Sequence, residues 1–279
     1  MQERQRRREA ERRRRLRAKK RRKMLMRRLL LVAMAAVCLI GAVRGMQKSG
    51  KKTGEEPERT REEPSMEEYI QSHARDYPDS LLQLLERNPE TLQFVYDYPQ
   101  EKEKDHKIDL SDQVSRGTIP LFLQWDKRWG YRTYGSDMMA ITGCGPTCLS
   151  MVLCALTGDA DWSPWEVAQY SEENGYYVEG TGTAWALMSQ GAAALGLTAE
   201  ELTLSDSGIR RRLEAGQPII CSMGPGDFTV SGHFIVLSGL NDDGTIQIRD
   251  PNSPNNSDQD WELQRLMDQM QNLWAYTVA

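Results

Sequence analysis

The chain has 279 residues, of which 39% are hydrophobic and 27% are charged, and its formal net charge is −4. This length suits one good-sized hydrophobic core and argues against two large domains. Residues 1–28 carry 16 Lys and Arg against three Glu, whereas the rest carries 20 Lys and Arg against 37 Asp and Glu. Phosphate contacts need clustered positive charge, so the acidic remainder argues against nucleic-acid binding by the folded part.

The segment that follows the basic arm predicts a membrane anchor at residues 29–46. It begins with fifteen uncharged residues before Arg44. About 20 apolar residues cross a bilayer core, and flanking methionines and snorkelling arginines make up the difference. A cleaved signal peptide is the alternative, but its charged region is normally short and a small-residue cleavage site normally follows. Because the basic residues precede the span, the positive-inside rule places the N-terminus in the cytoplasm and the body outside.

Three segments link the predicted anchor to the globular part. Residues 47–64 are a charged tether that contains Pro and Gly and has almost nothing to bury. Residues 65–99 predict a small helical subdomain, which opens with a capping box of Ser65 and Glu68. Two further short helices are expected there, each ending at the next proline. Residues 100–117 form a second polar linker. The small helices are interpreted as an arm that lies on the body, inhibits it or spaces it.

Residues 118–279 have the composition of a globular domain. Hydrophobic runs and capping signals predict helices first and strands afterwards, which indicates an α+β fold. The expected helices are 144–158, 163–175, 183–196 and 205–216, and the expected strands are 119–125, 217–223, 232–240 and 245–250.

The five cysteines are Cys38 in the predicted span and Cys144, Cys148, Cys154 and Cys221 in the body. Their spacing does not match a zinc knuckle or ribbon, and only three His are present, so neither a metal nor an organic cofactor is expected. Cys148 and Cys154 are interpreted as small packing residues. A disulfide from either one to Cys221 stays open.

Cys144 lies at the start of a predicted helix, between Gly143 and Gly145. The positive end of the helix dipole and backbone N–H groups favour a thiolate at such a position. We expect the two glycines to let a substrate backbone approach closely. A cysteine of this kind is more often structural than catalytic when it is considered alone, so a base and an orienting group are needed.

His233 supplies a base, because it opens a predicted strand after a Gly-rich loop. A four-residue turn at 241–244 would pair His233 with Asn252 and Asp250 with Ile235. His233 and Asp250 would then share one face as diagonal neighbours, roughly 7–8 Å apart. A three- or five-residue turn would break this arrangement. The expected chemistry is proton transfer from a thiol to an imidazole that a carboxylate orients.

The runs IPLFLQWDKRWG, ITGCGPTCLSMVL, GHFIVLSG and IRDPN, in this order, resemble the cysteine peptidases related to bacteriocin double-glycine leader peptidases, in the papain-like clan. The likeness covers about 118–279 and is to the stand-alone extracellular branch, common in Gram-positive bacteria. It implies a papain-like fold with Cys144 as nucleophile, His233 as base, Asp250 as orienting group and Gln124 as the oxyanion-hole amide. In the leader peptidases this Gln lies a few residues before the Cys, whereas here about twenty residues separate them.

The function expected from these features is a membrane-anchored, extracellular cysteine peptidase with a peptide or protein as substrate. Two alternatives stay open: a peptidoglycan amidase or endopeptidase of the cell wall, and an inactive papain-like binding module. The cleavage preference and the oligomeric state do not follow from the sequence.

Overall fold

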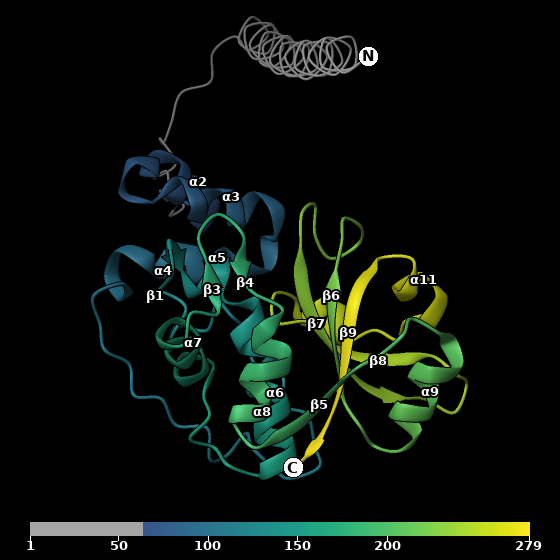
Figure 1. Ribbon diagram of the computed structural model, residues 1–279. Coiled ribbons are helices and arrows are strands. Elements are labelled where there is room, and N and C mark those ends of the chain that lie inside the picture. Colours follow the sequence, from purple (N-terminus) through teal and green to yellow (C-terminus); the bar gives the residue numbers. More distant parts are fainter. Residues whose placement is uncertain (1–63) are drawn as a thin grey trace, which may run out of the picture. The chain divides into compact units, whose positions relative to one another are not determined.

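The computed structural model describes residues 64–279, which belong to one compact unit (Figure 1). The predicted basic arm, the predicted anchor at 29–46 and nearly all of the tether lie outside the described residues. Within residues 64–279, no helix is both long enough and apolar enough to cross a membrane. The described part therefore consists of the helical arm and the globular body.

The body is organised around a five-stranded antiparallel sheet with the order β5-β9-β6-β7-β8. Strands β9, β6 and β7 lie inside the sheet, and β5 and β8 form its edges. The strands are β5 Leu197–Glu201, β6 Ile219–Met223, β7 His233–Leu240, β8 Ile246–Arg249 and β9 Met270–Val278.

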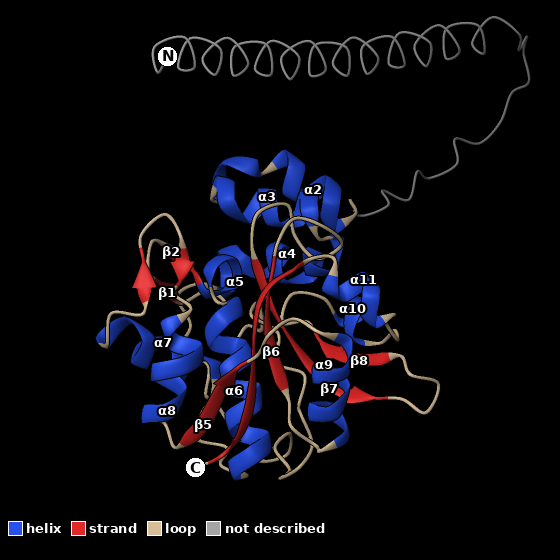
Figure 2. Ribbon diagram, turned by 45° about the vertical axis from the view of Figure 1, so that its right-hand side comes forward, coloured by secondary structure: helices blue, strands red, loops and turns tan. Residues whose placement is uncertain are grey.

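Both faces of the sheet are covered by helices (Figure 2). Ile220 packs with helices α6 and α7 in one hydrophobic core, and its neighbour Ile219 packs with helices α9 and α11 in another, as the period-two geometry of a strand requires. The helices of the body are α5 Met139–Thr142, α6 Cys144–Thr157, α7 Pro164–Glu173, α8 Ala192–Ala194, α9 Asp206–Glu214, α10 Pro254–Ser257 and α11 Leu263–Met267, with a π-helical turn at Leu187–Gly191. The predicted α+β fold is confirmed.

Helix α6 is the central helix of the body. It contains no charged residue, and eleven of its fourteen residues are buried, which is typical of a helix surrounded by protein on all sides. Gly158 ends it in the left-handed conformation with a φ of 76°, as the sequence predicts. The first residue of α6 is therefore held by a rigid, fully packed element.

The arm contains three α-helices, α2 Met66–Ser72, α3 Asp79–Arg87 and α4 Leu92–Glu101, and two short 3-10 helices, Ala74–Asp76 and Pro89–Thr91. The capping box of Ser65 and Glu68 is present at the start of α2, as predicted. The prediction that α4 ends at the next proline is wrong, because α4 continues through Pro99 to Glu101. Pro99 lies in the last turn, where the ring removes one N–H donor without interrupting a long helix.

The arm packs directly on the body through aromatic contacts. Phe94 of α4 stacks on Tyr131, with ring centroids 4.1 Å apart, and the Tyr131 hydroxyl donates to the Phe94 carbonyl at 2.7 Å. Ile70, Leu81 and Val95 of the arm complete this core together with Met138 and Ala140 of the body. The arm and the body thus share a hydrophobic core.

The strand predicted at 119–125 is absent, and this prediction is wrong. The segment has no strand partner, and its backbone groups bond elsewhere: the Gln124 N–H donates to the Pro251 carbonyl at 2.7 Å, and Arg249 Nε donates to the Ile119 carbonyl at 3.2 Å. The segment therefore crosses the end of β8 and is hydrogen-bonded to the loop that follows β8.

The sequence patterns do not predict β5 or β9. Four consecutive residues of β9, Leu273 to Tyr276, are buried, so the strand lacks the alternation of a sheet with one wet face. Strand β5 has the sequence LTAEE and pairs only with β9 at the sheet edge, where charged residues are tolerated.

Candidate active site

Cys144 is the first residue of α6, and its side chain is half-buried. A Cβ atom on Gly145 would lie 2.7 Å from the Thr183 side chain, and one on Gly143 would lie 2.5 Å from the Met139 carbonyl. Both glycines are thus required by close internal packing at the start of α6. The expectation that they also let a substrate backbone approach closely stays a prediction.

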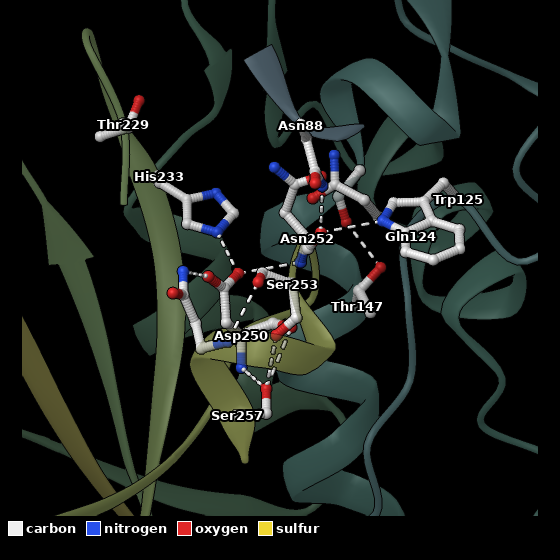
Figure 3. Close-up of polar contacts among 12 residues, drawn as sticks. Asn88, Gln124, Trp125, Thr147, Thr229, His233, Asp250, Asn252, Ser253 and Ser257 are labelled. Carbon is white, nitrogen blue, oxygen red and sulfur yellow. Dashed lines mark hydrogen bonds and ion pairs between the residues drawn. The ribbon is translucent and has the colours of Figure 1, made fainter. Parts of the chain in front are cut away.

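His233 and Asp250 form a buried pair (Figure 3). His233 Nε2 lies 2.7 Å from Asp250 Oδ1, and their side chains are 7% and 1% exposed. Since Nε2 faces the carboxylate, Nδ1 is the ring nitrogen left for a second partner. Cys144 lines the same two hollows as His233, and its side chain is among the groups that raise the pKa of His233.

The β7–β8 hairpin brings this pair together by a route that differs in part from the predicted one. The loop spans five residues, 241–245, which by itself would put the two side chains on opposite faces. A β-bulge between Leu237 and Gly239 adds one residue to β7 and restores the pairing of Val236 with Arg249. The predicted register therefore holds beside Asp250, although the predicted four-residue turn is wrong.

A polar network holds the Asp250 carboxylate in place (Figure 3). Oδ1 also accepts from the Asn252 N–H at 2.9 Å, and Oδ2 accepts from Asn256 Nδ2 at 2.8 Å. The Asp250 N–H donates to Ser257 Oγ at 2.9 Å. These hydrogen bonds fix the orientation of the carboxylate, with Oδ1 facing His233 Nε2.

The electrostatics of the pair favour a charged imidazole. Burial lowers the pKa of His233, but the charge and hydrogen bond of Asp250, together with those of Cys144, outweigh it and raise the pKa to about 10. An imidazolium next to a cysteine stabilises negative charge on the sulfur.

Gln124 lies in the same cavity as Cys144 and His233, despite the long insertion between Gln124 and Cys144. Its side chain is buried, and Nε2 donates to the Ala140 carbonyl at 2.7 Å. An amide nitrogen has two N–H groups, so one of them is available to another acceptor. The insertion contains α5, whose residue Ile141 lines the same cavity as Gln124 and Cys144, so both ends of the insertion lie at the site.

Two hollows meet at the Cys144–His233 pair. One, of about 520 Å³, lies between α3 and the loop 226–232. The other, of about 740 Å³, is bounded by the hairpin of β3 (Tyr177–Val178) and β4 (Gly182–Thr183), and by Trp185. An extended ligand thus has room on two sides of Cys144.

The sequence profile of the Peptidase_C39 like family matches residues 117–279, which is more than half of the chain. The chain belongs to this family. Membership supports a cysteine peptidase, and it agrees with the resemblance noted in the sequence. A comparison with curated proteins finds no match.

The remaining thiols of this C39-like domain are unlike Cys144. Cys148, Cys154 and Cys221 are buried and free of disulfides. Burial raises the pKa of all three thiols, that of Cys154 to about 12, so they stay protonated at neutral pH. The interpretation of Cys148 and Cys154 as packing residues agrees with their complete burial.

The sequence patterns do not predict the groups that hold Asp250. Asn252, Asn256 and Ser257 lie in the run DPNSPNNS, and the high density of Asn and Ser after a strand was the available signal. The arm also contacts this loop: Asn88 Nδ2 donates to the Asn252 carbonyl at 2.6 Å. The Glu90 carboxylate accepts from Ser253 Oγ and from the Asn255 N–H.

Proposed function

We propose that this chain is a membrane-anchored, extracellular cysteine peptidase that hydrolyses peptide bonds through Cys144, His233 and Asp250. The observation that carries the proposal is the buried His233–Asp250 pair, with the second imidazole nitrogen left for Cys144 at the start of α6. The two hollows that meet there support an extended peptide as substrate. The basic arm and the apolar segment at 29–46 support the anchor and its orientation.

The reaction begins with transfer of the Cys144 thiol proton to His233 Nδ1, while the Nε2–H of the ring keeps donating its hydrogen bond to Asp250. The thiolate attacks the carbonyl carbon of the scissile bond, and the π electrons of the carbonyl move onto its oxygen. Gln124 Nε2 and the Cys144 N–H are the donors that stabilise this oxyanion. Collapse of the intermediate breaks the C–N bond, and the leaving amine takes the proton from Nδ1.

The resulting thioester is then hydrolysed, with water as the nucleophile and the Cys144 thiolate as the leaving group. His233 Nδ1 removes a proton from water, and the hydroxide attacks the thioester carbonyl. The C–S bond then breaks, the carboxylic product leaves, and the thiolate–imidazolium pair is restored. Asp250 keeps its charge throughout and stabilises the imidazolium in each half of the reaction.

Cleavage of an unbiased peptide library by the full chain tests this proposal. We expect cleavage that disappears in Cys144→Ala and in His233→Ala, and that persists in Cys154→Ala, a buried thiol at the other end of α6. Release of soluble muropeptides from purified walls, with no cleavage of the library, would instead favour the cell-wall alternative. No turnover of either substrate, together with equal iodoacetamide labelling of all four body thiols, would favour the inactive binding module.

The anchor and the orientation are tested separately. Protease treatment of intact cells that express the full chain should remove residues 118–279. Full protection of this segment would overturn the extracellular orientation without touching the proposed chemistry.

A further inference from the structure

One face of α3, in the arm, borders the hollow beside Cys144. Four residues of this helix line the cavity that also contains Cys144 and His233: Ser80, Gln83, Leu84 and Arg87. Their spacing of three and four residues places them on one side of the helix. Since the family match begins at residue 117, this wall of the cavity comes from outside the matched segment.

The opposite wall is the loop 226–232, whose one charged side chain, Asp227, forms an ion pair with Arg265. The Asp227 carboxylate accepts from Arg265 Nε and Nη2, both at 2.8 Å, and from Gln269 Nε2 at 2.8 Å. Val230 in this loop is exposed, whereas Phe228 lines the cavity but is largely buried against Trp261. This wall therefore offers a substrate mainly apolar and neutral polar contacts.

Arg87 is the charged group of this cavity that is left without a carboxylate. Its guanidinium donates to Gln83 Oε1 at 3.0 Å, and among residues 64–279 it forms no ion pair. The third charged group that lines the cavity, His233, is paired with Asp250. The guanidinium is exposed and carries donors in a fork that matches a carboxylate.

We propose that α3 and the loop 226–232 form a substrate subsite that selects an acidic side chain, with Arg87 as the specificity-determining residue. This inference rests on the proposed peptidase function and adds a substrate class to it. The arm is then neither a plug nor a spacer: it leaves Cys144 accessible and supplies one wall of the cleft. An exposed ion pair of this kind favours an acidic over a neutral side chain by a few-fold. Reversal of the Arg87 charge turns this attraction into a similar repulsion, so the free-energy change is about twice that of removing the charge.

The test is a cleavage assay of the full chain with a peptide library that is acetylated and amidated, so that terminal charges do not contribute. Wild type should prefer Asp and Glu at one position on one side of the scissile bond. Arg87→Glu should change the ratio of acidic to basic residues at that position by about tenfold, in favour of Lys and Arg. Arg75→Glu, which makes the same charge change elsewhere in the arm, should keep the wild-type preference. The preference of wild type should also weaken as salt increases.

Three outcomes would contradict the inference in distinguishable ways. Cleavage with no acidic preference in wild type, or with the same preference in Arg87→Glu, overturns the subsite and leaves the peptidase function standing. An equal change in Arg75→Glu shows a general effect of net charge and also overturns the subsite. No cleavage by wild type overturns the proposed function, and the subsite with it.

Discussion

Replacement of Asp250 by Asn should remove most of the positive charge on His233 at neutral pH. Burial lowers the pKa of His233, and Asp250 is the main group that raises it, from an ordinary value of 6.5 to about 10. This rise corresponds to about 5 kcal/mol of preference for the charged imidazole. Asn keeps the shape of the side chain and removes its charge, so the burial effect is no longer offset. The imidazolium of wild type persists up to about pH 10, whereas that of the variant should be lost near or below pH 6.5.

The assay is an NMR titration of the histidine ring protons, combined with the rate of Cys144 alkylation by iodoacetamide. The His233 midpoint should fall from about 10 to near or below 6.5, and alkylation at pH 7.5 should slow on the order of 10²-fold. Asp243→Asn, an exposed carboxylate in the turn of the same hairpin, is the matched control and should change neither quantity. A midpoint that stays near 10 in Asp250→Asn would refute the assignment of the shift to this carboxylate.

Four further outcomes are expected. Gln124→Ala should reduce kcat by about 10²- to 10³-fold with little change in KM, and an equal loss in KM would point to ground-state binding instead. Phe94→Ala should lower the free energy of unfolding by about 3–5 kcal/mol in urea titrations, because Phe94 is buried between arm and body. His233 has a folded pKa above its unfolded value, so the charged form stabilises the fold fully below about pH 6.5, and this contribution is lost as the pH rises through about 10. The difference in melting temperature between wild type and His233→Gln should therefore shrink steadily over that window, and a constant difference would contradict the linkage. Glu90→Ala should remove the acceptor of the Ser253 hydroxyl, loosen the loop after Asp250 and so lower the NMR midpoint of His233. Glu90→Gln should restore this midpoint in part. An unchanged midpoint in Glu90→Ala would limit Glu90 to a structural role.

Local sequence signals predicted much of the fold because they act through neighbouring residues. The capping box at Ser65, the glycine stop at Gly158 and the Ser163 cap of α7 each satisfy backbone groups within one turn. Strands β6, β7 and β8 were recognisable as apolar runs between turn residues. The α+β class followed from the order of these elements.

Other elements depended on partners that lie far away in the sequence. Residues 119–125 have the composition of a strand, yet they pair with no other strand. Their backbone groups form hydrogen bonds with a loop and with side chains instead. Strand β9 is buried on both faces between β5 and β6, so its pattern carries no alternation to read. The bulge in β7 is likewise a product of the sheet, since it corrects a loop whose length would otherwise misalign the site.

By itself, the sequence determined the chemistry available to this protein: one cysteine at a helix start, one histidine at a strand start and one aspartate at the far end of the same hairpin. Helix capping and strand periodicity are short-range effects, so these places in the helix and strands could be worked out from the sequence, whereas the shared face of His233 and Asp250 depended on the bulge in β7. The tertiary structure alone decided that Gln124 returns to the site across its insertion and that α3 forms a wall of the cleft. Both depend on packing between segments far apart in the chain, where the shape of the whole core selects the contact and no local pattern records it.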